Sequence, residues 1–188
     1  MNEPLNLPLD KRAFLRWAEG REGHFELKGN RVVMMTGGTK NHARVTARIA
    51  TALSRRLDPD RWAITTADLA VETGEDVRYP DVLVEALDDE GDALSTTRPV
   101  LVVEVLSPSS LALDLNVKAF EYMSLDSLEC YIVAAQDEPR AWVWQRPATG
   151  SDRRFPAAPQ EILGRDANIG VAAFGIEISL GEVYRERR

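Results

Sequence analysis

The alternation of apolar and polar positions predicts a helix followed by a β-hairpin at the N-terminal end of the chain. Residues 10–20 place apolar side chains on one helical face, and Asp10 precedes them as a suitable N-cap. Two β-like runs, 24–27 and 32–35, lie on either side of the sequence Lys-Gly-Asn at 28–30. Because glycine and asparagine tolerate the positive φ angles of a tight turn, we expect the two runs to pair as antiparallel strands.

A longer helix is predicted from Thr39 to about Leu57, with Thr39 as its cap. Its inward face recurs at steps of three and four residues and consists of His42, Val45, Ile49, Leu53 and Leu57. A separate stripe on this helix is basic and consists of Arg44, Arg48 and Arg55. These arginines are candidate contacts for nucleic-acid phosphates. A solvated helix face is the more common explanation of such a stripe.

From residue 62 onward the pattern changes to short apolar runs that favour strands. These predicted strands cover residues 62–66, 69–72, 79–84 and 99–106. The run 99–106 is the most apolar of the chain, as expected for a central strand that is covered on both faces. A helix is predicted next, over residues 110–123. It is followed by a hairpin with strands 131–135 and 141–145, by a loop over 146–160 and by a β-rich C-terminal end. The sum is an α/β chain, a mixed sheet with packed helices, in a single domain over residues 1–188.

The composition excludes several classes of protein. The chain has 188 residues, of which 44% are hydrophobic and 28% charged, as in an ordinary globular protein. No apolar run approaches the ~18 residues that a membrane span needs, so we expect no membrane partner. The N-terminal stretch lacks the basic start and apolar core of a secretion signal, and the single cysteine, Cys130, has no partner for an internal disulfide. We therefore predict a cytoplasmic protein.

The charge is unevenly distributed along the chain. The net charge is −7, which by itself argues against nucleic acid as a partner. Residues 10–61, however, carry 12 Lys and Arg against 6 Asp and Glu, whereas residues 62–139 carry 3 against 17. An acidic middle beside a basic N-terminal third suits a metal site flanked by a phosphate-contacting surface. It suits a protein with unevenly charged loops nearly as well, so the charge alone does not decide the function.

Two carboxylates on apolar strands carry the strongest functional signal. Glu104 lies inside the run Val-Leu-Val-Val-Glu-Val-Leu, where a buried charge needs a cation, hydrogen bonds or a proton. Asp81 stands at the start of another apolar strand, directly after Pro80. If the two strands are neighbours, the carboxylates repel each other unless a cation lies between them, and hard oxygen ligands select Mg²⁺ or Mn²⁺. The alternatives are an Asp81 that caps a turn and a Glu104 that pairs with a backbone amide or an arginine.

The helix after the Glu104 strand carries a third candidate, Lys118. Asp114, Lys118 and Tyr122 are spaced by four residues and so line one helix face. An exposed ion pair between Asp114 and Lys118 explains the spacing of these two residues equally well. Tyr122 is expected mainly to pack, with its hydroxyl as a polar tip.

These segments resemble a known family. The sequence Tyr-Pro-Asp-Val-Leu-Val at 79–84, the sequence Val-Val-Glu-Val-Leu-Ser-Pro-Ser-Ser at 102–110 and the helix that carries Lys118 are similar to the Uma-type restriction endonucleases, also catalogued as domain of unknown function 820. This family belongs to the PD-(D/E)XK nuclease superfamily. The likeness extends from about residue 10 to 184 and includes the N-terminal segment Phe-Glu-Leu-Lys-Gly-Asn at 25–30.

The resemblance implies a restriction-endonuclease-like core with flanking helices, to which the N-terminal helix and hairpin are added. It implies that Asp81, Glu104 and the backbone carbonyl of Val105 bind Mg²⁺, with Mn²⁺ as a substitute. The superfamily lysine normally stands two residues after the glutamate, where this chain has Leu106. In the Uma-type group its role passes to a lysine on the next helix, which is Lys118 here. Asp81, Glu104 and Lys118 are thus the predicted catalytic residues.

Four residues are predicted as accessory groups: Glu26, His42, Asp114 and Tyr122. Glu26 is placed to hydrogen-bond a metal-bound water, but a surface position in the hairpin is at least as good an explanation. His42 shares the inward face of its helix, and a core histidine with satisfied hydrogen bonds is the favoured interpretation.

The function predicted from the sequence is a metal-dependent endonuclease that acts on DNA and forms a homodimer. The main alternative is a catalytically silent protein of the same fold that binds nucleic acid or a protein partner, and a hydrolase of small phosphate esters is a third. No glycine-rich phosphate loop, zinc-binding Cys/His spacing or serine nucleophile motif supports a different enzyme class.

Overall fold

The computed structural model describes residues 9–35, 37–106, 113–149 and 153–185. It confirms the N-terminal helix α1 (Lys11–Ala18), whose first turn is capped by the Asp10 carboxylate, which accepts from the Ala13 amide at 2.7 Å. It also confirms the hairpin of β1 (His24–Lys28) and β2 (Arg31–Met35). Gly29 and Asn30, with φ angles of 51° and 62°, form its turn. Positive φ at both central residues gives the turn the twist that a two-residue hairpin loop needs.

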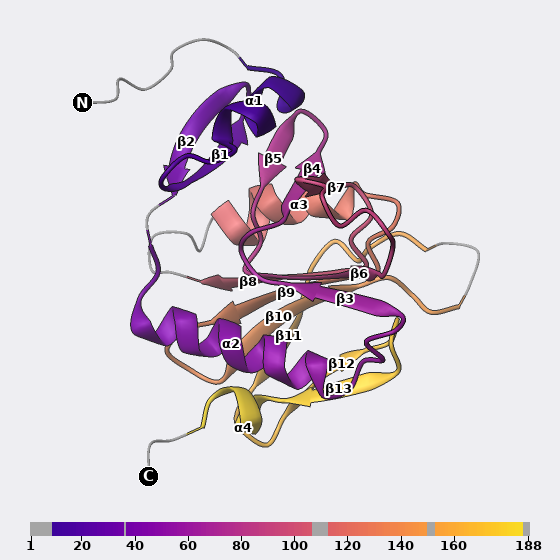
Figure 1. Ribbon diagram of the computed structural model, residues 1–188. Helices are drawn as coiled ribbons and strands as arrows, with labels where there is room; N and C mark the ends of the chain where they lie inside the picture. Colours follow the sequence, from indigo (N-terminus) through magenta and orange to yellow (C-terminus); the bar gives the residue numbers. More distant parts are fainter. Residues whose placement is uncertain (1–8, 36, 107–112, 150–152, 186–188) are drawn as a thin grey trace.

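A six-stranded mixed sheet lies at the centre of the protein (Figure 1). Its order is β11-β10-β9-β8-β6-β3, formed by Gln160–Leu163, Arg140–Gln145, Cys130–Ala135, Leu101–Leu106, Val82–Ala86 and Trp62–Thr65. β8 and β9 are parallel, and the other neighbouring pairs are antiparallel. All six residues of β8 are buried, as predicted for a central strand.

A second sheet lies on the side of the central sheet that faces α3 (Figure 1). Its order is β2-β1-β5-β4-β7, in which the further strands are Asp76–Arg78, Ala70–Thr73 and Ser95–Thr96. The sequence analysis did not predict β5 or β7. Both are too short and too polar to show a period, and each is held by pairing, β5 with β1 and β4, and β7 with β4.

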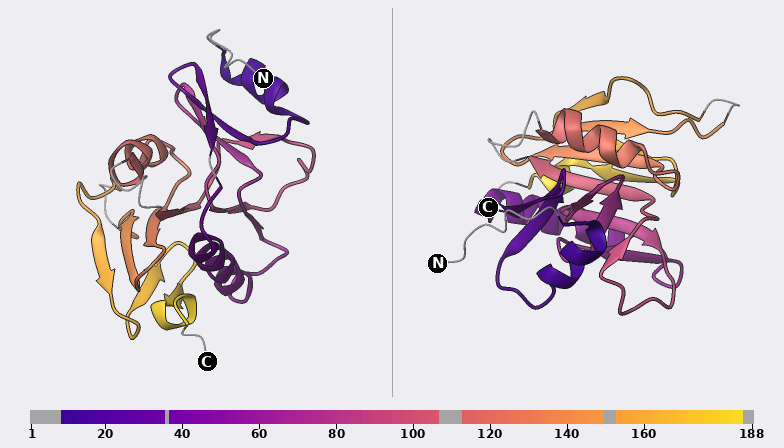
Figure 2. Two further views of the ribbon diagram at one scale, coloured as in Figure 1. Left: turned by 90° about the vertical axis from the view of Figure 1, so that its left-hand side faces the viewer. Right: turned by 90° about the horizontal axis from the view of Figure 1, so that it is seen from above.

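Helices cover both faces of the central sheet (Figures 1 and 2). On one face lie α2 (Lys40–Ser54), the small hairpin of β12 (Asn168–Val171) and β13 (Ile176–Ser179), and the short α4 (Leu180–Val183). On the other face lie η1 (Leu113–Lys118), a π-helical turn, and α3 (Ala119–Met123). Strand alternation therefore sends Val103 and Val105 toward α2, but Val102 and Leu106 toward α3.

Several element bounds differ from those predicted. The strand predicted over 79–84 begins only at Val82, so residues 79–81 precede β6. The helix predicted to reach about Leu57 ends at Ser54, with Arg55 as its C-cap. The helix predicted over 110–123 is a π-helical turn followed by five α-helical residues; the part of this prediction that falls on residues 107–112 lies outside the described residues. No helix in the described part of the chain has the length and apolar character to cross a membrane.

Candidate active site

Glu104 lies in the middle of the site and is buried on β8, with 4% of its surface exposed. It shares the α3 side of the sheet with Val102 and Leu106, so its carboxylate meets the helical segment that follows the strand. Oε1 of Glu104 accepts a hydrogen bond from Lys118 Nζ at 3.1 Å and one from the Tyr122 hydroxyl at 3.0 Å. The spacing of four residues between Lys118 and Tyr122 thus brings both donors to the same carboxylate oxygen, as the helical pattern predicted.

Tyr122 is more than a packing residue. Its side chain is fully buried, and burial together with the charge of Glu104 raises the pKa of the Tyr122 hydroxyl well above its ordinary value. The hydroxyl therefore stays protonated at neutral pH and donates to the carboxylate. Its ring also contacts that of Tyr131, with ring centroids 5.4 Å apart, which fixes its orientation.

Asp81 stands directly opposite Glu104. β6 and β8 are antiparallel with Val82 paired to Val103, so the same register continued by one residue places Asp81 across from Glu104. Residues directly opposite on antiparallel strands have Cβ atoms roughly 4.5–5.5 Å apart. Oδ2 of Asp81 accepts from the Val105 amide at 2.7 Å, which holds the carboxylate beside β8. Of the two predicted metal ligands, Glu104 therefore lies on β8 and Asp81 directly before the neighbouring strand β6, at one end of the sheet.

His42 is not the core histidine that the helical pattern favoured. Its side chain is 19% exposed, and Nε2 lies 3.2 Å from Oδ2 of Asp81. The hydrogen bond to Asp81 raises the pKa of His42 above its ordinary value of 6.5 against the opposing effect of burial, and the charge of Glu104 and a backbone hydrogen bond with Val105 add to the increase. His42 was placed on the inward face because it is in helical register with Val45, but it lies in the first turn of α2, beyond the covered part of the sheet.

This pairing predicts a pH dependence that can be measured. Because the pKa of His42 is higher in the folded protein than in the unfolded chain, its ion pair stabilises the fold below about pH 6.5 and loses this effect as the pH rises through the folded-state pKa. The stability difference between the wild type and His42→Asn should therefore shrink from pH 6 to pH 8 in metal-free buffer. Nuclear magnetic resonance titration of the imidazole measures the pKa directly, and a His24→Gln variant leaves His42 as the only histidine. A folded-state pKa at or below 6.5 would contradict the pairing.

Glu26 is part of the site and not a surface residue of the hairpin. It is 6% exposed on β1, and Oε1 lies 3.7 Å from Lys118 Nζ without a hydrogen-bond partner of its own. Oε2 accepts from Arg78 Nη1 at 3.0 Å. The surface interpretation failed because β1 is an inner strand of its sheet, between β2 and β5.

Arg78 is a member of this charged network that was not predicted from the sequence. It ends β5, is 1% exposed and binds three carboxylates, since it also forms a two-pronged pair with Glu121 of α3 at 2.8 Å and contacts Asp76 at 3.1 Å. Burial opposes the charge of Arg78, but the hydrogen bond with Glu121 and the charge of Glu26 raise its pKa above the ordinary value. A signal was present, because Arg78 is one of three cationic residues between 62 and 139 and lies between the apolar Val77 and Tyr79.

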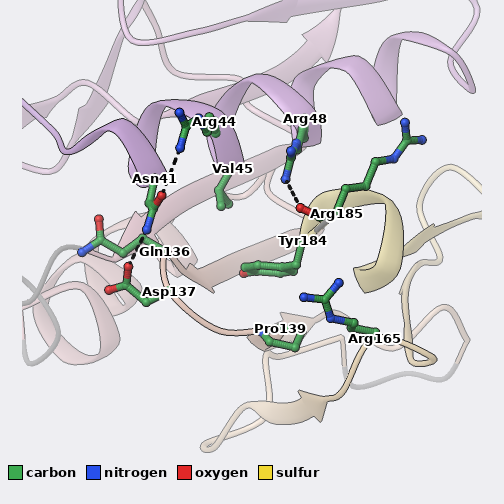
Figure 3. Close-up of a pocket in the computed structure, with 10 residues that line it drawn as sticks. All are labelled: Asn41, Arg44, Val45, Arg48, Gln136, Asp137, Pro139, Arg165, Tyr184 and Arg185. Carbon is green, nitrogen blue, oxygen red and sulfur yellow. Dashed lines mark hydrogen bonds between the residues drawn. The ribbon is translucent and has the colours of Figure 1, made fainter. Parts of the chain in front are cut away.

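The remaining predicted residues lie apart from this centre. Arg44 and Arg48 line a pocket of about 490 Å³ that neither Asp81 nor Glu104 lines, and Arg55 does not line it (Figure 3). The side chain of Asp114 lies outside the described residues, although its backbone belongs to η1.

The donor atoms and charges of the site fit a hard divalent cation. The carboxylates of Asp81 and Glu104 and the carbonyl of Val105, the predicted ligand set, are all oxygen donors of the kind that Mg²⁺ prefers. The ion-paired network around them contains four carboxylates, from Glu26, Asp76, Glu104 and Glu121, against the two cations Arg78 and Lys118. Asp81 adds a further carboxylate, which pairs with His42. In the described residues no group of three or more His, Cys, Asp and Glu side chains is arranged to hold a metal.

Sequence and structure comparisons agree on one family. Residues 12–180 match the family described as "Uma2: Putative restriction endonuclease". The uncharacterized protein slr1290 of Synechocystis sp. is 33% identical over 132 residues, which cover 68% of this chain and 68% of that protein. The uncharacterized protein sll1609 of Synechocystis sp. is 27% identical over 143 residues, which cover 73% of this chain and 78% of that protein. The crystal structure of a "putative nuclease belonging to DUF820" from Anabaena variabilis matches with a TM-score of 0.74 over 94% of this chain and 97% of that one; at 16% sequence identity this likeness shows the fold alone.

Proposed function

The chain belongs to the Uma2 family, described as putative restriction endonucleases, and we propose that it is an endonuclease that hydrolyses phosphodiester bonds in DNA with a divalent metal ion, Mg²⁺ or Mn²⁺. The observation that carries this proposal is that the Asp81 carboxylate accepts from the Val105 amide, next to Glu104 on β8, while Lys118 lies 3.1 Å from Glu104. Two carboxylates and a lysine at one end of a sheet supply the charges that metal-dependent hydrolysis of a phosphodiester uses.

Each side chain has a distinct part in the proposed reaction. Asp81, Glu104 and the Val105 carbonyl would hold the metal ion, which would supply Lewis-acid activation of the scissile phosphate and of a water molecule. Lys118 presents its ammonium group beside them, where it orients the water and stabilises the negative charge that develops on the phosphate. Tyr122 fixes the orientation of Glu104 through its hydrogen bond. Glu26 is a positioning residue that attracts Lys118 by its charge at 3.7 Å, and Arg78 positions Glu26 by a hydrogen bond at 3.0 Å.

Two measurements test the proposal. In crystals soaked with Mn²⁺, we expect anomalous density between the carboxylates of Asp81 and Glu104. Nicking of a supercoiled plasmid should require Mg²⁺ or Mn²⁺ and stop when a chelator is added. Metal binding and DNA binding without cleavage would instead indicate the catalytically silent alternative, and density elsewhere would contradict the ligand assignment.

Lys118→Ala should separate catalysis from metal binding. Because the lysine is assigned to the transition state, we expect cleavage to slow by about 100-fold or more. Metal affinity should stay the same or rise, since a positive charge beside Glu104 is removed. Single-turnover cleavage and calorimetric Mn²⁺ titration measure the two effects, with Lys118→Met as a control that keeps the packing of the stem. A loss of metal affinity that accounts for the whole loss of rate would contradict this role.

A homodimer, a cytoplasmic location and a single domain over residues 1–188 stay predictions. A dimer would let one protein cut both strands of a duplex, and analytical ultracentrifugation at micromolar concentration measures it directly.

A further inference from the structure

A basic pocket lies beside the candidate active site, between α2 and the C-terminal part of the chain (Figure 3). Its volume is about 490 Å³, which is within the range of ligand-binding cavities. Four arginines from three separate segments line it: Arg44 and Arg48 of α2, Arg165 after β11, and Arg185 after α4. The elements that meet here come from opposite ends of the sequence, so the fold brings these arginines together.

The pocket is a local concentration of positive charge in an acidic protein. Among its ten lining residues the only acid is Asp137, against four arginines, whereas the whole chain carries a net charge of −7. Asn41 donates a hydrogen bond to the Asp137 carboxylate at 2.9 Å, which occupies part of that single negative group. A concave surface lined by one sign of charge concentrates counter-ions, and guanidinium groups match the geometry of phosphate oxygens.

The wall of the pocket is held by hydrogen bonds to buried groups. Arg48 donates to the backbone carbonyls of Val183 at 2.9 Å and Arg185 at 3.4 Å, which fastens the C-terminal segment to α2. The buried Tyr184 donates its hydroxyl to the carbonyl of Ala135, at the end of β9. The shape of the pocket is therefore formed before a ligand binds, and little ordering of the backbone opposes binding.

The pocket lies at the same end of the sheet as the acids. β8 and β9 are parallel, and Gln136, which lines the pocket, follows directly after β9. Thr39, the cap of α2, donates to the side-chain oxygen of Gln136 at 2.6 Å. His42, which pairs with Asp81, is the neighbour of Asn41, which lines the pocket. The first turn of α2 therefore contributes one residue to the pocket, Asn41, and the next residue, His42, to the acid site.

We propose that this pocket binds backbone phosphates of the nucleic acid on one side of the scissile phosphate; this inference rests on the proposed function. The lining favours phosphate over a base, because Tyr184 is the only aromatic residue among the described residues of the lining and is itself buried. The pocket therefore contributes affinity and register that do not depend on base sequence. The same chemistry would accept free inorganic phosphate or a mononucleotide, so the experiment includes both.

Arg44→Gln and Arg165→Gln are the test variants, and Arg55→Gln is the matched control. Arg55 is the C-cap of the same helix, about 16 Å from Arg44 along the helix axis, and it does not line the pocket. Binding of a fluorescent 20-base-pair duplex is measured by anisotropy over a range of salt concentrations, with a chelator present to prevent cleavage. Each test variant should lower the salt slope by about one unit and weaken binding roughly 5- to 10-fold near 0.1 M salt, independently of the duplex sequence. Arg55→Gln should leave both quantities close to those of the wild type.

Three outcomes decide the matter. Equal slopes for Arg44→Gln, Arg165→Gln and Arg55→Gln would overturn the inference, even if cleavage by the wild type is found. Calorimetric binding of phosphate or adenosine monophosphate that is lost in Arg44→Gln, with no change in the duplex slope, would also overturn it, because the occupant would then be a free phosphate compound. Duplex binding that depends on both arginines in a protein without Mg²⁺-dependent cleavage supports the pocket and overturns only the proposed function.

Discussion

Glu104→Gln and Asp81→Asn are each expected to lower Mg²⁺-dependent plasmid cleavage by more than about 100-fold, beyond the loss that is typical for removing an outer-shell partner of a metal. Each substitution replaces a charged oxygen donor by a neutral amide at the position assigned to the ion. Rates are measured under single-turnover conditions over a range of Mg²⁺ concentrations. Glu85→Gln is the matched control. Glu85 lies on β6, the strand that Asp81 directly precedes, and Glu85 is not one of the proposed ligands.

The same two variants should differ in stability when no metal is present. Glu104 is buried and accepts hydrogen bonds from Lys118 and Tyr122. A neutral glutamine would weaken the interaction with the buried Lys118 ammonium, which should lower the free energy of unfolding by about 2 kcal/mol or more. Asp81 is partly exposed, and Asp81→Asn should cost less. Repulsion between the carboxylates alone would predict that both variants are at least as stable as the wild type. Wild-type cleavage by folded Glu104→Gln protein would refute the assignment of the metal site.

The long and regular elements could be predicted because local signals determine them. The capping aspartate of α1, the Gly29-Asn30 turn and the apolar periodicity of α2 each act over a few residues of sequence. The strands β5 and β7 could not be predicted, because three and two residues carry no period and their pairing partners are distant in sequence. The π-helical turn η1 was taken for α-helix, since both place a residue four positions on near the same face.

A site residue could be predicted only where its charge or polarity conflicts with the apolar sequence around it. Glu104 could be found because a carboxylate in an apolar strand requires an explanation. Helical spacing placed Lys118 and Tyr122 on one face, but the role of Lys118 came from the family resemblance, and Tyr122 was expected mainly to pack. The position of Glu26 could not be derived, because its burial depends on a second sheet that contains an unpredicted strand. Arg78 ends that strand, so no local pattern could reveal its partners on β1 and α3, which are 52 and 43 residues away respectively.

The ion pairs of Arg78 connect the second sheet with α3, and removing them should have the largest effect on stability. The guanidinium group is 1% exposed and pairs with Glu26 of β1 and Glu121 of α3. Replacement by methionine leaves these carboxylates without their cation in a buried setting. Breaking a buried pair in this way typically costs about 3–5 kcal/mol, a large part of the total stability of a domain.

Urea unfolding at neutral pH measures this loss, and Arg98→Met is the control. Arg98 also pairs with two acids, Asp88 at 2.8 Å and Glu90 at 3.6 Å, but its side chain is 61% exposed, so its removal should cost no more than about 1 kcal/mol. If Arg78→Met is too unstable to purify, the double variant Arg78→Met with Glu121→Gln should recover part of the loss, because one of the stranded charges is gone. Equal costs for Arg78→Met and Arg98→Met would mean that the second sheet is held to α3 by apolar packing alone, and that Glu26 needs no partner to stay beside Lys118.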